Sequence, residues 1–241
     1  NPLWDAFAWR ILACVLSGGA DFGECLTTLE RVGDGSAGDW HRAWTATAER
    51  LAGVAYESEA RGHAVSAREA YFRASHYHHA AYLPLFGAPV DERLAGSFQA
   101  EVTCFQRAAA PCQPAVEAVE IPFEGRTLPG YFVRALGDAG PRPTIVHVDG
   151  YDSNIQEMYF AHGPAAARRG YHCLVFDGPG QGRMLVRDGV TLRPDWERVV
   201  AAVLDFVVAR PEVDPWRVVL AGRGLGGFLA TRAAAFEGRI A

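Results

Sequence analysis

Three absences in this sequence limit what the protein can be. No apolar run approaches the ~20 residues that cross a bilayer, so no membrane-spanning helix is predicted. There is no basic excess: the formal net charge is −5 and both signs are interspersed, which argues against a nucleic-acid surface. The first apolar stretch has no basic leader, and Asp5 and Arg10 lie inside it. That stretch predicts an amphipathic helix and not a signal peptide.

Cysteine is also sparse and unpatterned. The five cysteines are scattered and odd in number, and they form no C-x-x-C pair. They therefore suit neither a disulfide framework nor a zinc or redox motif, and we expect reduced, buried thiols. With no leader and no membrane span in view, these features predict a cytoplasmic protein.

Residues 1–113 are predicted to form an all-helical domain. The chain has 241 residues, 49% of them apolar, which is enough for two modest domains. Trp40, Trp44, Leu51 and Val54 recur at helical spacing and make one apolar stripe. No strand pattern is present before residue 114.

Two more helices are expected in the same domain. Ser66 and Glu69 form a capping box, which predicts a helix from there towards Tyr82. Residues 91–109 make a further helix, closed off by the prolines that follow it.

Residues 114–241 carry strand patterns instead. Apolar and polar residues alternate on both sides of Glu124-Gly125, which predicts a β-hairpin. Beyond Thr144, the short apolar runs TIVHVDG, YHCLVFDG and RVVLAG alternate with helical segments. Such runs are typical of strands buried on both faces of a parallel sheet. The last intervening helix is expected to carry Pro194 in its first turn and to stop at Arg210-Pro211.

The stretch GRGLGG, Gly222 to Gly227, allows two interpretations. Its first, third and sixth residues fit G-x-G-x-x-G, the dinucleotide fingerprint. Its first, third and fifth fit G-x-S-x-G, the nucleophile elbow of α/β-hydrolases, with Gly224 in place of the serine. The fingerprint belongs in a first βαβ unit with an acidic residue about 20 residues on. Here the glycines follow the third parallel strand, with only Glu237 downstream. The position favours an elbow.

Three loops together carry a family resemblance: Gly150-Tyr151-Asp152-Ser153, Phe176 to Gly182 with the sequence FDGPGQG, and Gly222 to Gly227. With the helical segment SAREAYFRASHYHHAA, they resemble the α/β-hydrolases related to 2,6-dihydroxypseudooxynicotine hydrolase and the fungal hydrolases that shorten pigment polyketides. The resemblance covers nearly the whole chain. It implies an α/β-hydrolase sheet, partly covered by residues 114–241, behind an all-helical N-terminal domain that covers the cleft.

The activity that the resemblance implies is hydrolysis without a cofactor. The bond is a carbon–carbon bond next to a ketone, in a β-dicarbonyl or polyketide-like substrate, or an ester. The backbone N–H groups of Tyr151 and Leu225 would form the oxyanion hole, and Gly224 stands at the position of the nucleophilic serine. Further residues are expected to bind the small-molecule substrate: Gly150, Asp152, His76, Tyr77 and Arg223.

Simpler explanations stay open beside these roles. Gly224 marks an inactivated variant, a natural pseudo-enzyme or cyclase using the same pocket, a binding or scaffold protein, or a glycine turn unrelated to any elbow. Asp152 and Ser153 also fit a helix N-cap, and Arg223 a surface salt bridge. The run SHYHH does not predict a metal site, since its histidines do not share one helix face and no H-E-x-x-H is present.

Two expectations concern partners. The acid and histidine of the family's triad would come on strands after Ala241, and residues 217–222 would otherwise form an exposed sheet edge. We therefore expect the rest of the hydrolase domain, as a continuation or a second chain. The aromatic faces of the helical domain, including Trp4, Trp9 and Tyr82, predict a homodimer.

Overall fold

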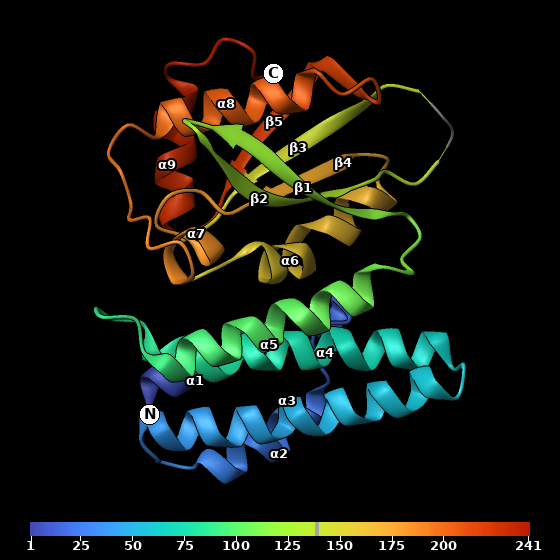
Figure 1. The fold of residues 1–241 in the computed structure, drawn as a ribbon, viewed down its shortest axis with the longest axis vertical. Coiled ribbons are helices and arrows are strands. Elements are labelled where there is room, and N and C mark those ends of the chain that lie inside the picture. Colours follow the sequence, from blue (N-terminus) through green and yellow to red (C-terminus); the bar gives the residue numbers. More distant parts are fainter. Residues whose placement is uncertain (138–139) are drawn as a thin grey trace. The chain divides into compact units, whose positions relative to one another are not determined.

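In the computed structural model, which describes residues 1–137 and 140–241, the chain forms two compact units. Asn1–Cys112 is built from helices, and Gln113–Ala241 is built around a mixed sheet (Figure 1). Among the described residues, no helix has both the length and the apolar character to cross a membrane.

The helical unit centres on three long helices that pack side by side, α3 against α4 and α4 against α5 (Figure 1). Its helices are α1 (Pro2–Leu12), η1 (Val15–Ser17), α2 (Phe22–Val32), α3 (Ala37–Ala60), α4 (Ala64–Tyr82), η2 (Leu83–Leu85) and α5 (Glu92–Ala109). The helix expected over residues 91–109 is confirmed, with Asp91 as its N-cap.

Helix α3 shows how the apolar stripe is used. Trp40, Trp44 and Leu51 are buried, as their spacing predicts. Val54 is 45% exposed, so its inclusion in the stripe is wrong. The buried face continues at Ala55 instead, because 3.6 residues per turn carry position 54 past the edge of the face.

The capping box predicted at Ser66 and Glu69 is wrong. Helix α4 begins at Ala64, and its N-cap His63 makes no side-chain hydrogen bond to the helix. Gly62, with a φ of 77°, turns the chain so tightly after α3 that the new helix has started before Ser66.

The aromatic residues expected on a contact face are mostly core. Trp4 is buried, stacks on Trp40 with ring centroids 4.9 Å apart, and donates its indole N–H to the Gly35 carbonyl. Tyr82 is buried as well, whereas Trp9 is 73% exposed. Of the three aromatic residues named for a dimer face, only Trp9 is available at the surface of this unit.

The second unit confirms the predicted hairpin and parallel strands. Its elements are β1 (Val116–Phe123), β2 (Arg126–Val133), β3 (Arg142–Val148), α6 (Ile155–Arg168), β4 (His172–Phe176), α7 (Gly182–Val186), α8 (Trp196–Val208), β5 (Val213–Gly222) and α9 (Leu225–Ala234). The strand order is β1-β2-β4-β3-β5. The strands β4, β3 and β5 are parallel, while β2 runs antiparallel to both of its neighbours.

Helices cover both faces of this sheet (Figure 1). Helix α6 packs on β2 and β4, and α8 and α9 pack on the other face, where the main apolar core lies. The predicted start of α8 is wrong by two residues: Asp195 is the N-cap, so Pro194 precedes the helix. A proline there still suits the extended chain that leads into the helix.

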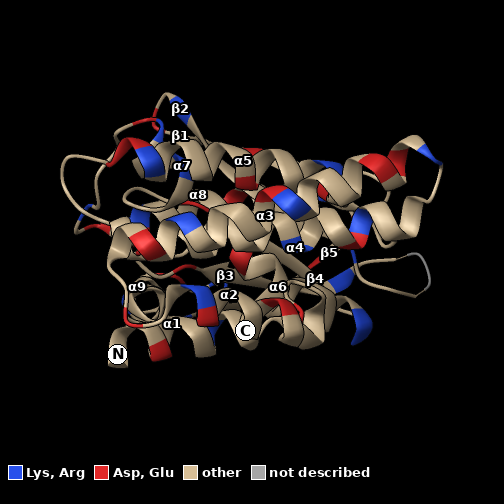
Figure 2. Ribbon diagram, turned by 90° about the horizontal axis from the view of Figure 1, so that it is seen from below, with Lys and Arg blue, Asp and Glu red and all other residues tan. Residues whose placement is uncertain are grey.

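All 23 basic residues of the chain are arginines. In the view of Figure 2, basic and acidic residues alternate along the helices. Many arginines form ion pairs; on the β1–β2 hairpin the pairs are Arg210 with Glu117, Arg183 with Glu120 and Arg193 with Glu124. Pairing of this kind neutralises the surface locally.

Candidate active site

The three loops that carry the family resemblance leave the sheet at one level. In the strand register, Val148 at the end of β3 pairs with both Phe176 of β4 and Gly222 of β5. The loops that follow these residues therefore start from one row of the sheet. In open α/β sheets the carboxyl ends of parallel strands are where ligands bind.

The β5–α9 turn has space for a side chain at Gly224 but none at the flanking Gly222 and Gly226. A Cβ on Gly222 would lie 2.2 Å from the Gly226 carbonyl oxygen, and one on Gly226 would lie 2.1 Å from the Val148 carbonyl oxygen. At Gly224, by contrast, a Cβ would meet no heavy atom of the described residues within 4 Å. Gly224 has φ 56° and ψ −126°, a conformation that side-chain-bearing residues rarely adopt.

This pattern fits the elbow better than the dinucleotide fingerprint. The fingerprint needs its third glycine for close packing of helix on strand. Here that glycine is Gly227, and its Cβ would make only an ordinary contact, 3.6 Å from the Gly222 carbonyl oxygen. The close approaches fall on Gly222 and Gly226, the flanking glycines of G-x-S-x-G.

The β3–α6 loop lies against this turn. The Arg223 N–H donates to the Val148 carbonyl at 3.3 Å, and a Cβ on Gly150 would lie 3.5 Å from the Arg223 carbonyl oxygen. Tyr151 follows Gly150 with a 60% exposed side chain, and Leu225 is the first residue of α9. The two amides predicted for the oxyanion hole therefore belong to two segments in contact.

The cap of α6 is not where the sequence placed it. Asn154, and not Asp152 or Ser153, is the N-cap, and its side-chain oxygen accepts from the Glu157 N–H at 3.0 Å. The Ser153 hydroxyl instead donates to the Glu157 carboxylate at 2.8 Å. Asp152 stays in the loop beside Gly150, and its Oδ1 would lie 3.9 Å from a Cβ there.

A buried acid behind the elbow escaped sequence analysis. Glu157 is fully buried in the first turn of α6, and its Oε1 lies 3.6 Å from the Nη1 of Arg223. Arg223 thus forms the predicted salt bridge, but with a buried partner. The one-turn spacing of Ser153 and Glu157 is visible in the sequence, yet nothing local there distinguishes a buried acid from a surface one.

Two histidines occupy the same region. His147 on β3 and His162 on α6 are stacked, with ring centroids 4.0 Å apart. Burial, together with the nearby His162 and Arg223, lowers the pKa of His147 to about 3. Burial also lowers the pKa of His162. Both rings are therefore neutral near pH 7.

The FDGPGQG loop after β4 is architectural. The Asp177 carboxylate accepts from the Ile155 N–H at 3.0 Å and from the Arg183 N–H at 2.9 Å, so it joins the first residues of α6 and α7. The Gln181 amide donates to the carbonyls of Asp149 and Gly150, at 2.6 and 3.2 Å. This loop holds the β3–α6 loop in place, and the sequence did not reveal either contact.

His76 and Tyr77 lie in the helical unit, and both are buried. The His76 Nδ1–H donates to the Gly19 carbonyl at 2.9 Å. The Tyr77 hydroxyl accepts from the Asp21 N–H at 2.8 Å and donates to Glu24 at 2.9 Å. These bonds give Tyr77 a structural role at the start of α2, and its predicted substrate contact stays a prediction.

The cysteines lie in the interior of the two units. All five are buried and none forms a disulfide. Burial raises the pKa of the Cys25 and Cys104 thiols to about 11 and that of Cys173 to about 12. No cluster of metal-ligating side chains is found among the described residues.

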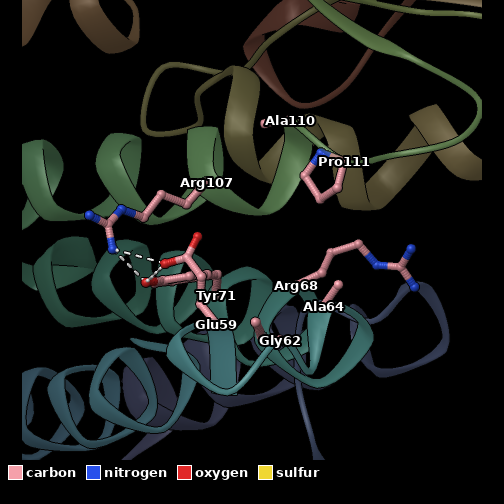
Figure 3. A pocket seen from close by; sticks show the side chains of 9 residues that line it. Glu59, Gly62, Ala64, Arg68, Tyr71, Arg107, Ala110 and Pro111 are labelled. Carbon is pink, nitrogen blue, oxygen red and sulfur yellow. Dashed lines mark hydrogen bonds and ion pairs between the residues drawn. The ribbon is translucent and has the colours of Figure 1, made fainter. Parts of the chain in front are cut away.

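The helical unit contains a pocket with a volume of about 410 Å³ (Figure 3). On one side, Arg107 donates to the Tyr71 hydroxyl at 2.6 Å, and that hydroxyl donates to Glu59 at 3.1 Å. Arg68 stands on the other side (Figure 3). Because Glu59 already has Arg107 and Tyr71 as partners, the pocket offers no unmet charge there, and it contains none of the predicted site residues.

Comparison with known proteins agrees with this geometry. The family described as "Esterase FrsA-like" matches residues 24–240. The hydrolase acrC of Aspergillus aculeatus is 42% identical over 245 residues, covering 94% of this chain and 57% of that protein. The 20-hydroxy-prefusarin hydrolase FUS2 of Gibberella moniliformis is 38% identical, covering 93% of this chain and 56% of that protein.

A solved structure is similar over both units. The crystal structure of 2,6-dihydroxy-pseudo-oxynicotine hydrolase matches with a TM-score of 0.82 at 27% identity, over 97% of this chain and 62% of that chain. The chain spans little more than half the length of the curated relatives it matches.

Proposed function

Because the chain belongs to the FrsA-like esterase family of α/β-hydrolases, we propose that the whole protein binds a carbonyl compound at the β5–α9 turn. The chemistry of this site is hydrolysis, of a carbon–carbon bond next to a ketone or of an ester. A β-dicarbonyl substrate suits the first reaction, since its leaving carbanion is stabilised as an enolate. No cofactor is needed for either.

One observation carries this proposal: the conformation of Gly224 and the open space above it. A serine there would extend its hydroxyl from the turn, while Gly222 and Gly226 allow the close packing behind it. Glycine itself has no nucleophile. The chain with Gly224 is therefore expected to bind its substrate without forming an acyl-enzyme.

The remaining roles follow from the two segments that meet at the turn. The Tyr151 and Leu225 N–H groups would hold the developing oxyanion, each worth about 3 kcal/mol in the transition state. Gly150 allows close approach, and Asp152 would contact the substrate at the rim. His147 is too deeply buried to act as the base. We place the triad acid and histidine in polypeptide outside residues 1–241.

The test is to restore the nucleophile in the complete protein. Loss of a catalytic serine costs about 10⁶ in kcat, so Gly224→Ser should raise hydrolysis of aryl esters or β-diketones by several orders of magnitude. Gly224→Ala is the matched control, since it has the same Cβ and backbone strain without the hydroxyl, and it should stay inactive. A folded Gly224→Ser protein inert towards both substrate types would refute the hydrolase assignment.

A second candidate is binding without hydrolysis, as a scaffold or a cyclase, and Gly224 itself favours it. It predicts that a non-hydrolysable β-diketone analogue binds the Gly224 protein, measured by calorimetry, while Gly224→Ser adds no hydrolysis. Dinucleotide bound against Gly222 to Gly227 would contradict both candidates.

For assembly, we propose a homodimer through the exposed apolar side chains of α1 and α2. Leu3, Trp9 and Phe22 are more than half exposed there. We propose that these side chains contribute to one contact patch, since contiguous exposed apolar patches mark protein contacts. Sedimentation of the complete protein should show a dimer at micromolar concentration, and Trp9→Glu should shift it to monomer. A monomeric wild-type protein would remove this proposal.

A further inference from the structure

Arg223 lies against the segment that runs from the end of β3 to the first turn of α6, through both its backbone and its side chain. Its N–H donates to the Val148 carbonyl at 3.3 Å. Its carbonyl oxygen lies 3.5 Å from the position of a Cβ on Gly150. Its Nη1 lies 3.6 Å from the Oε1 of Glu157. The backbone and the side chain of Arg223 therefore both lie against residues within or next to the loop that leads into α6.

The partner of the guanidinium is firmly held. Glu157 is fully buried in the first turn of α6, where a negative charge is favoured by the helix dipole. Its Oε2 accepts from the Ser153 hydroxyl at 2.8 Å, and its N–H donates to Asn154 at 3.0 Å. A buried carboxylate is costly unless a cation compensates it. The Arg223 side chain, 43% exposed, supplies that cation from the surface side.

From these contacts we propose that Arg223 is a positioning residue whose ion pair with Glu157 sets the separation of the Tyr151 and Leu225 amides. Tyr151 lies in the loop between Gly150 and Glu157, and Leu225 comes two residues after Arg223. The inference rests on the proposed function, since the two amides act as a pair only if they hold one oxygen. Both donors must then lie about 3 Å from that oxygen.

The kinetic test uses the complete protein carrying Gly224→Ser. A displacement of about 1 Å can cost ~10² in rate, so adding Arg223→Met should lower kcat ten- to hundred-fold. KM should stay within about threefold, because the oxyanion contact is made in the transition state. Arg223→Lys should restore most of the rate, since the 3.6 Å contact is one of charge with charge. Arg223→Gln replaces Arg223→Met if the latter does not fold.

Two further variants separate positioning from general damage. Glu157→Gln should lower kcat as Arg223→Met does, and the double variant should be no worse than either single one. Arg232→Met is the matched control: Arg232 lies on α9, which follows the turn, and pairs with Glu197 of α8 at 2.9 Å, away from the loop. It should leave kcat unchanged. Additive losses from the Arg223 and Glu157 changes would overturn the proposal.

A structural measurement makes the inference independent of turnover. Crystal structures of the complete Gly224 protein, with and without Arg223→Met, should differ by at least ~0.5 Å in the distance between the Tyr151 and Leu225 amide nitrogens. An unchanged distance would overturn the positioning role, whatever the activity. A changed distance with an inert Gly224→Ser protein would sustain the positioning role while the proposed function fails.

Discussion

Two glycine-rich turns leave the same edge of the sheet and use their glycines in opposite ways. In the turn after β4, a Cβ on Gly178, Gly180 or Gly182 would come within 3 Å of Trp196, Leu192 or Asp177 respectively. In the turn after β5, Gly222 and Gly226 are equally closed, but Gly224 opens onto free space among the described residues.

The two turns therefore differ in whether each glycine position has space for a side chain. The β4 turn is filled at each of its glycines and carries a carboxylate that joins two helices. In the β5 turn, Gly222 and Gly226 have no space for a side chain, whereas Gly224 between them does. Glycine spacing alone does not separate these cases; the atoms that a Cβ would meet do.

Among the substitutions, the largest expected loss of stability would come from filling the closed part of the β5–α9 turn. In Gly226→Ala the Cβ would lie 2.1 Å from the Val148 carbonyl oxygen and 2.3 Å from that of Asp149. Because both are backbone atoms, the change should cost about 3 kcal/mol of unfolding free energy. Gly224→Ala meets no such atom and should cost only about 1 kcal/mol, from its positive φ. Denaturant unfolding of the complete protein measures both, and equal costs would contradict the contrast.

Acid should weaken the region behind the elbow. The pKa of His147 is about 3 in the folded protein, against about 6.5 for an ordinary histidine. Between these values the unfolded chain binds a proton that the folded chain does not. Stability should therefore fall as pH decreases from about 6.5 towards 3, by up to ~1.4 kcal/mol per pH unit from this group.

The variant His147→Asn tests this origin. It should reduce the slope of unfolding free energy against pH in that window, as measured by denaturant unfolding at several pH values. His63→Asn is the matched control, because His63 is exposed in the helical unit. Identical slopes for the wild type and His147→Asn would show that His147 is not the source.

A smaller loss is expected from the β4 turn. Asp177→Asn removes the charge that receives the N–H groups of Ile155 and Arg183 and should cost about 2 kcal/mol. Asp188 offers a control, since its exposed carboxylate lies 3.7 Å from the Arg183 guanidinium. Asp188→Asn should cost under about 0.5 kcal/mol. If Asp177→Asn were equally mild in thermal unfolding, the β4 turn would not have the architectural role given to it.

The smallest effect distinguishes the two glycine motifs. Gly227 lies in the first turn of α9, where an added Cβ would make an ordinary 3.6 Å contact. Gly227→Ala should be neutral or stabilising by up to ~1 kcal/mol, because alanine favours helix. A loss of several kcal/mol in the same assay would instead favour the dinucleotide fingerprint, which requires its third glycine.

Local patterns in the sequence were enough for the order and type of the elements. The alternation around Glu124-Gly125 gives the hairpin, and the continuous apolar runs give the parallel strands, since each pattern reflects which faces of a short segment are buried. The prediction of an elbow rested on the place of its glycines after the third parallel strand. The starts of two helices were predicted less well. Ser66 and Pro194 suggested where α4 and α8 begin, but α4 begins before Ser66 and α8 begins after Pro194.

What the tertiary structure alone decided concerns contacts between segments far apart in the chain. Glu157 pairs with Arg223 because α6 buries it there, and Asp177 accepts two backbone N–H groups because the starts of α6 and α7 converge on it. Trp4 was taken as a surface residue, but it stacks on Trp40. A sequence records the residue types but not which distant backbone or side chain will lie within 4 Å, and burial, charge pairing and the space above Gly224 all depend on that.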